Sequence, residues 1–146
     1  MTPTVNVRHE VGLELAQQLL AGVYEEAQKR GVAMGAAVVD PGGALVAAQR
    51  MDGAQLVAVD LATDKAFTAV AFGAPTEAWA ESTRPGEGDW GLSTVLGGRI
   101  VVFAGGLPIV VDGEVVGGLG VSGSAAAVDR ACAEAGLRAA GLEPPA

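Results

Sequence analysis

The sequence contains one histidine and one cysteine, and each scarcity excludes a class of site. A zinc centre with several histidine ligands needs more than His9, and a disulfide framework needs more than Cys132. A Ser-His-Asp triad would depend on His9, which lies close to the N-terminus. We therefore expect no cluster of metal ligands and no disulfide, and we expect Cys132 to be a small buried hydrophobic side chain.

Positive charge is also scarce. The 146 residues include 9 Lys and Arg against 17 Asp and Glu, which gives a net charge of −8. The basic residues form no run, whereas phosphate backbones and anionic membrane surfaces are bound by clustered basic side chains. We therefore expect neither nucleic acid nor a membrane as a partner.

Long apolar runs are missing as well. The longest one is interrupted by Asp40-Pro41-Gly42-Gly43, so it does not span a bilayer. The first residues lack the basic start and apolar core of a signal peptide, which favours a cytoplasmic protein. Hydrophobic residues make up 50% of the chain and charged residues only 18%. Because monomers rarely expose large apolar patches, this composition favours a homo-oligomer, a dimer or larger.

The pattern of apolar residues predicts a single α+β domain over residues 1–146. Asp-Pro-Gly-Gly, Gly105-Gly106 and Asp112-Gly113 each predict a hairpin turn. The expected elements are helix 11–30, strands 32–39 and 44–50, helices 56–72 and 76–82, strands 99–103, 107–111 and 114–121, and helix 124–140. This α-β-β-α-α-β-β-β-α order is typical of a mainly antiparallel sheet with helices packed on it. The glycine-rich residues 83–98 are predicted to form a binding loop or lid.

Residues 118–123, Gly-Leu-Gly-Val-Ser-Gly, match the G-x-G-x-x-G of dinucleotide-binding turns. That fold needs a parallel strand after the helix, whereas here the preceding strand belongs to a hairpin and one helix fills residues 124–140. The dinucleotide interpretation therefore fails, and two compatible ones remain. Gly117, Gly118 and Gly120 let an alanine-faced helix lie close to the sheet, or Ser122 and Gly123 open a helix whose free N–H groups bind an anion.

Three residues are candidates for acid–base catalysis. Lys65 lies among small apolar residues, where partial burial lowers a lysine pKa and suits it to act as a base or nucleophile. Asp60 can share its helical face, and Asp52 lies with Arg50 at a strand end, where side chains often reach a cleft. The alternatives are a solvated or salt-bridged Lys65 and an Arg50–Asp52 ion pair that only holds a turn.

Five stretches in register resemble the GlcG/HbpS-like family, which includes the C-terminal domain of the PduO cobalamin adenosyltransferases. They are VVDPGG at 38–43, RMDGA at 50–54, KAFTA at 65–69, GGLP at 105–108 and DGEVVGGLGVSG at 112–123, followed by Asp129. The resemblance implies a profilin-like fold with a five-stranded antiparallel sheet and helices on both faces. It also implies dimers or larger rings with small-ligand pockets near subunit contacts.

Several members of that family bind haem, and some are described as haem-degrading or redox-sensing. The matching positions that could line a pocket are Arg50, Asp52, Lys65, Gly105, Gly106, Ser122 and Gly123. Haem takes an axial His, Met, Cys or Tyr ligand. The candidates here are His9, Tyr24, Met34, Met51 and Cys132. Arg50 or the amides of Ser122 and Gly123 could bind the propionates.

The sequence thus leaves three functions open. The first is binding of haem or a related tetrapyrrole for storage, sensing or degradation, with His9 among the ligand-binding residues. The second is a cofactor-independent isomerase, lyase or cyclase that acts on a small metabolite, with Lys65 and Asp52 or Asp60 as proton carriers. The third is a non-catalytic accessory subunit.

Overall fold

The computed structural model describes residues 1–146 and contains one four-stranded sheet with three α-helices. The helices are α1 (Leu13–Arg30), α2 (Ala58–Phe72) and α3 (Ala126–Ala139). The strands are β1 (Gly35–Val39), β2 (Leu45–Arg50), β3 (Gly106–Val111) and β4 (Glu114–Ser122). They lie in the order β2-β1-β4-β3, and every neighbouring pair is antiparallel. The predicted α+β class with an antiparallel sheet is therefore confirmed.

The predicted fifth strand, residues 99–103, is wrong. Its backbone bonds to threonine hydroxyls instead of a neighbouring strand. The Thr68 hydroxyl accepts the Val101 N–H at 3.0 Å and lies 3.2 Å from the Arg99 carbonyl oxygen. The Thr76 hydroxyl donates to the Phe103 carbonyl at 2.6 Å. These hydrogen bonds hold residues 99–103 along α2. The profilin-like arrangement implied by the resemblance stays a prediction.

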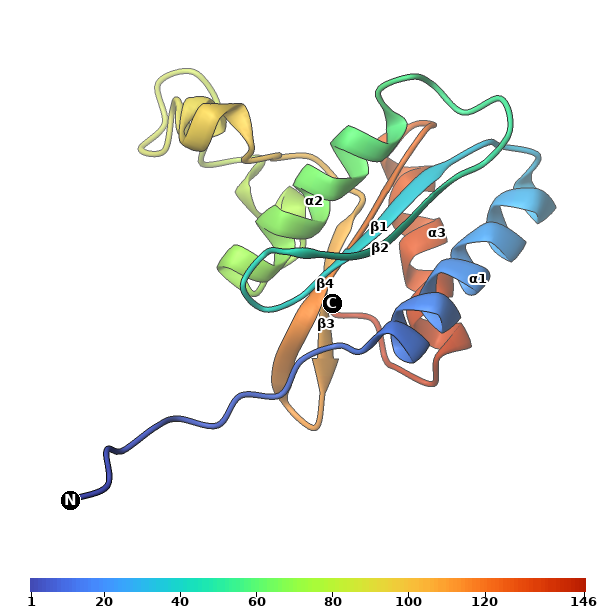
Figure 1. The fold of residues 1–146 in the computed structure, drawn as a ribbon. Coiled ribbons are helices and arrows are strands. Elements are labelled where there is room, and N and C mark those ends of the chain that lie inside the picture. Colours follow the sequence, from blue (N-terminus) through green and yellow to red (C-terminus); the bar gives the residue numbers. More distant parts are fainter.

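The sheet lies between two helical layers (Figure 1). α2 packs on one face, and α1 and α3 lie side by side on the other. The apolar core fills the space between the sheet and the α1–α3 layer. Its largest fully buried members include Leu19, Leu119 and Leu137, from α1, β4 and α3.

On the α2 face, β4 carries glycines where α2 comes close. A Cβ added to Gly118 would lie 2.2 Å from the Ala66 carbonyl oxygen, and one added to Gly120 would lie 1.8 Å from that of Ala62. Only hydrogen fits between this strand and the helix backbone. Gly118 and Gly120 therefore serve close helix–sheet packing, whereas the prediction is wrong for Gly117, which approaches the Val39 carbonyl oxygen instead of α2. β4 is antiparallel to both of its neighbours, as no dinucleotide-binding turn would have it.

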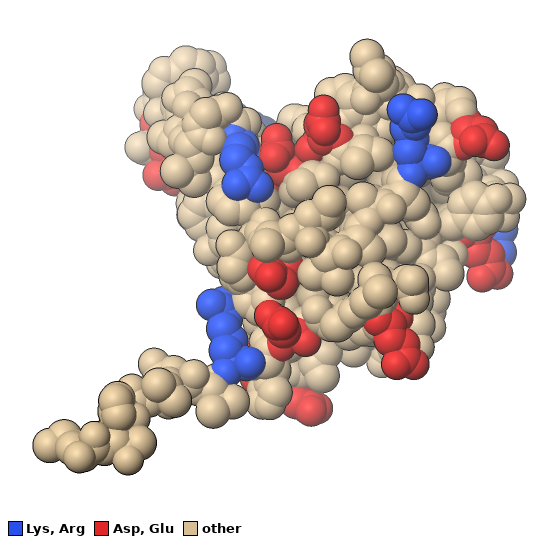
Figure 2. Space-filling view, in the orientation of Figure 1, with Lys and Arg blue, Asp and Glu red and all other residues tan.

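Residues 83–98 protrude from the body of the protein (Figure 1). They contain only turns and the two short 3₁₀-helices η2 (Leu92–Thr94) and η3 (Leu96–Gly98), and Trp90 is 66% exposed. The helix predicted over residues 76–82 is observed as a shorter 3₁₀-helix, η1, which spans Thr76–Trp79. No helix in the structure combines the length and the apolar character that crossing a membrane requires. The Lys and Arg side chains on the face in Figure 2 stand singly.

Candidate functional site

Lys65 is completely buried and forms an ion pair with Asp129. Its Nζ lies 2.9 Å from Asp129 Oδ2 and also donates to the Val121 carbonyl at 3.0 Å. The ring of Phe103 lies beside the ammonium, with 5.1 Å between Nζ and the ring centroid. Burial removes the ammonium of Lys65 from water, and these contacts replace the water that it loses.

The fold positions this pair at the beginning of β3. Gly106 is the first residue of β3 and pairs with Gly120. One position further, the Val121 N–H donates to the Gly105 carbonyl at 2.9 Å, whereas the Val121 carbonyl accepts from Lys65. A Cβ on Gly105 would lie 2.5 Å from Lys65 Nζ, and only glycine leaves that space free. The lysine thus extends from α2, past the end of β3, to Asp129 on α3.

The electrostatics of the pair follow from burial. Desolvation lowers the pKa of Lys65, while the hydrogen bond and the charge of Asp129 act in the opposite direction. The other oxygen of Asp129 accepts the Ser124 N–H at 2.9 Å. The Ser124 N–H lies at the end of β4 where we expected an anion to bind. It is already hydrogen-bonded to a carboxylate of the chain itself.

The structure brings together some of the predicted site residues. Gly105 and Gly106 both pack against Lys65. Gly35 of β1 pairs with Arg50 on one side and with Ser122 on the other, so these two residues lie in one row across the sheet. Ser122 is buried, whereas Arg50 is exposed on the edge strand β2.

Other predicted residues lie outside this group. Asp52 and Asp60 are exposed, and neither is hydrogen-bonded to Lys65, whose carboxylate partner is Asp129. A Cβ on Gly123 would lie 2.4 Å from the Ala33 carbonyl oxygen, so that glycine serves a close backbone approach. Sequence reasoning missed Asp129 as a site residue, because 64 positions separate it from Lys65.

His9 belongs to a second site, at the opposite end of β4. It borders a surface cleft of about 440 Å³ whose lining residues are His9, Glu10, Leu15, Val111, Asp112, Glu114 and Val116. Glu114 is the first residue of β4 and Ser122 the last, so about eight strand steps, roughly 26 Å, separate this cleft from the Ser122 row. His9 and Arg50 therefore do not line one pocket.

Glu114 holds His9 at two atoms. Its Oε2 lies 2.7 Å from His9 Nδ1, and its Oε1 accepts the backbone N–H of His9 at 3.3 Å. The hydrogen bond and the charge of Glu114 raise the pKa of His9, and the same contact lowers the pKa of Glu114. The imidazole is 76% exposed and its Nε2 makes no hydrogen bond, so this nitrogen is accessible.

The other candidate axial ligands are less accessible than His9. Met34 and Cys132 are buried, and burial raises the pKa of the Cys132 thiol to about 11. The sulfur of Met51 lies 3.3 Å from the backbone N of Met34. Tyr24 is exposed on α1, where its hydroxyl accepts from the side chain of Gln28.

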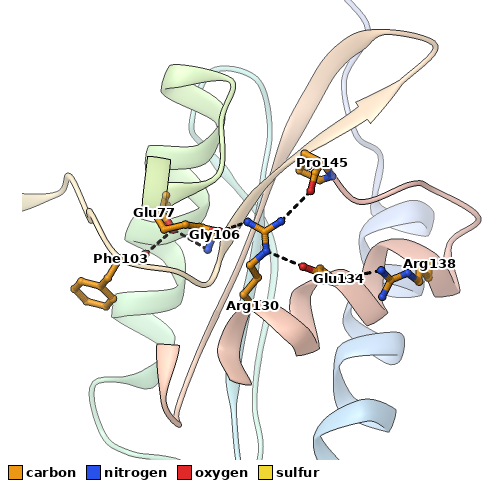
Figure 3. A network of polar contacts seen from close by, with 8 residues as sticks. Glu77, Phe103, Gly106, Arg130, Glu134, Arg138 and Pro145 are labelled. Atoms are coloured by element: carbon orange, nitrogen blue, oxygen red, sulfur yellow. Dashed lines mark hydrogen bonds and ion pairs between the residues drawn. The ribbon is translucent and has the colours of Figure 1, made fainter. Parts of the chain in front are cut away.

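A third polar group centres on Arg130 (Figure 3). Its guanidinium contacts Glu77 of η1, donates to Glu134 of α3 at 2.7 Å and donates to the Pro145 carbonyl at 2.9 Å. The group joins η1, α3 and the C-terminal residues. The sequence could reveal only its i,i+4 pairs within α3, which are Arg130–Glu134 and Glu134–Arg138.

Residues 11–138 match the family described as haem-degrading, HbpS-like proteins. The chain belongs to the HbpS-like family. An uncharacterised 15.0 kDa protein from the dhaT–dhaS intergenic region of Citrobacter freundii is 35% identical over 127 residues, which cover 87% of the HbpS-like chain and 89% of the relative. This family assignment confirms the resemblance carried by the five sequence stretches.

Two solved structures are similar to this HbpS-like chain over nearly its whole length. The Klebsiella pneumoniae protein ORFY has a TM-score of 0.93 and 31% identity, with 97% of each chain covered. The PduOC–haem complex has a TM-score of 0.87 and 32% identity, covering 93% of this chain and 97% of the other. In the second of these structures, the protein is in complex with haem.

Proposed function

We propose that this protein binds haem, or a related tetrapyrrole, at the cleft beside His9. The observation that carries the proposal is the accessible Nε2 of His9, on an imidazole whose other nitrogen is held by Glu114 at 2.7 Å. Metal-bound histidines usually have this arrangement, with the second ring nitrogen bonded to a carboxylate or carbonyl group. The haem complex formed by a relative of similar fold supports the same ligand class.

The residues around the cleft fit one side of a haem. Leu15, Val111 and Val116 would supply an apolar wall, and His9 would supply a nitrogen ligand to the iron. When bound, haem supplies an iron centre whose ligand binding and redox potential depend on the axial residue and its surroundings. Glu10 and Asp112 also line the cleft, and their negative charge disfavours propionates there. The propionates would therefore have to be bound by groups outside this cleft.

Haemin titration of the purified protein, followed by visible absorbance, tests the proposal. We expect a saturable Soret shift in the wild type, its loss in His9→Ala, and its retention in the control Tyr24→Phe. A titration curve equal to that of denatured protein would refute haem binding. Incubation of the complex with a reductant and oxygen then separates degradation, in which the Soret band disappears, from storage.

We also propose that the protein is a homo-oligomer. Large apolar side chains are exposed at separate places on the chain, with Leu56 at 91%, Trp90 at 66% and Leu96 at 62%. A contact between subunits that covered these side chains would remove them from water, which favours association. Light scattering on a size-exclusion column tests the proposal, and a mass of one chain across a range of concentrations would refute it.

A second candidate function is cofactor-independent acid–base catalysis by Lys65. Its support is the buried ammonium with a lowered pKa beside the carboxylate of Asp129. Lys65 lines neither the cleft beside His9 nor a second surface cleft between α1 and α3, so catalysis would require the segment around Phe103 to open. The chain has only two lysines, which permits a direct test with an amine-reactive reagent. Exposed Lys29 should be labelled in every case, and labelling of Lys65 in the folded protein would favour the catalytic role.

A further inference from the structure

Glu114 is placed by the tight turn that joins β3 to β4. Asp112 and Gly113 both have positive φ angles, 51° and 78°, as hairpin turns of two residues require. The turn pairs Val111 with Glu114 and fixes the backbone position of Glu114. Two residues after His9, the Val11 N–H donates to the Val116 carbonyl at 2.8 Å. The backbone near His9 is thus fastened to the same strand that carries Glu114.

From this geometry we infer that Glu114 is a positioning residue for His9: its carboxylate holds Nδ1 as the protonated nitrogen and leaves the lone pair of Nε2 directed at a ligand. The inference rests on the proposed function, because it assigns Glu114 a role in haem ligation. Its basis is the double contact, since Oε1 fixes the main chain of His9 while Oε2 fixes the ring. A neutral imidazole that donates from one nitrogen must accept at the other.

A simple tether for the N-terminal residues is the competing explanation. The imidazole is 76% exposed, and an exposed ion pair contributes little to the stability of a fold. A tether predicts that removal of Glu114 loosens the first residues without altering the ring tautomer or the properties of a bound iron. A positioning role predicts changes in both.

Asp112 provides a matched control. It acts on His9 through charge only, whereas Glu114 acts through hydrogen bonds and charge. Asp112→Asn therefore removes a nearby negative charge and leaves the hydrogen bonds in place. Glu114→Ala removes the contact, and Glu114→Gln keeps the length of the side chain while it removes the charge.

The experiment combines one measurement on the free protein with two on the haem complex. Nitrogen-15 NMR of His9, at a pH where the ring is neutral, should report the Nδ1–H tautomer in the wild type and in Asp112→Asn. Glu114→Ala should give a mixture. Haemin affinity should fall roughly 10- to 100-fold in Glu114→Ala, as is usual when the hydrogen-bond partner of a metal-bound histidine is lost. The reduction potential of the complex should become more positive, because the ligand is less basic.

The outcomes separate the two proposals. If His9→Ala abolishes haem binding while Glu114→Ala leaves the tautomer, the affinity and the potential unchanged, haem binding by His9 stands and the positioning role is overturned. If wild-type protein binds no haem, or His9→Ala binds it as well as wild type does, the proposed ligand and the role of Glu114 both fail. If Asp112→Asn reproduces every effect of Glu114→Ala, charge alone explains them and the positioning role is again overturned.

Discussion

Lys65 and Asp129 form an ion pair in which Nζ and Oδ2 are 2.9 Å apart and the two side chains are 0% and 3% exposed. The pair links α2 to α3, which lie on opposite faces of the sheet. Removing one partner leaves the other as an unpaired buried charge. We therefore expect Lys65→Met to lower the free energy of unfolding by about 3–5 kcal/mol, measured by chemical denaturation.

The double variant Lys65→Met/Asp129→Leu serves as the control for this prediction. It removes both charges, so it should recover much of the stability lost in the single variant. A single variant as stable as wild type would contradict the view that the pair is an integral part of the fold.

The thiol of Cys132 should be inert in the folded protein. Burial raises its pKa to about 11, so the reactive thiolate is scarce at neutral pH. We expect no reaction with a thiol reagent at about pH 8 and one equivalent of reaction per chain after unfolding in denaturant. Rapid labelling of native protein would mean that α3 opens locally.

The imidazole of His9 should titrate above its ordinary value of 6.5, because the hydrogen bond and charge of Glu114 favour the protonated ring. A raised pKa in the folded state means that the contact stabilises the protein below about pH 6.5. This contribution is lost as the pH rises through the raised pKa. Proton NMR of the single histidine measures the shift directly. Glu114→Gln should bring the pKa back toward 6.5, and an unchanged value in that variant would disprove the assignment.

Gly120→Ala should be strongly destabilising, because its methyl group would lie 1.8 Å from the Ala62 carbonyl oxygen. Forcing α2 away from the sheet costs at least about 3 kcal/mol, the upper end of the usual effect of overpacking. Gly88→Ala is the matched control, since an added Cβ there meets no atom within 4 Å. Thermal unfolding of both variants checks the prediction, and equal midpoints would contradict it.

The parts of the fold that the sequence predicted are those encoded by local patterns. The helix predicted over residues 11–30 is observed as Leu13–Arg30, because its apolar face and the stop at Gly31 lie within one stretch of sequence. Both observed hairpins were predicted from their turn residues, whereas the third predicted hairpin, at Gly105-Gly106, is wrong because residues 99–103 form no strand. Residues 99–103 have the apolar character of a strand, but hydroxyl groups of Thr68 and Thr76, about thirty positions away, take their backbone hydrogen bonds. No local pattern reveals such partners.

The candidate sites were predictable only in part, for the same reason. Lys65 was conspicuous as the single lysine in a helix of small apolar residues, and His9 as the single histidine of the chain. Their carboxylate partners, Asp129 and Glu114, are 64 and 105 positions away. Pairing across such distances depends on the tertiary fold.

The glycines of β4 have a consequence for how α2 is located along its own axis. Four residues of a helix advance about 6 Å and two residues of a strand about 6.6 Å, so the two repeats nearly coincide. Ala62 meets Gly120 and Ala66 meets Gly118 at equivalent contacts one repeat apart. With matched repeats, α2 can pack closely on β4 only at positions about 6 Å apart along its axis. Of these positions, only the observed one brings the ammonium of Lys65 past Gly105 to its carboxylate partner.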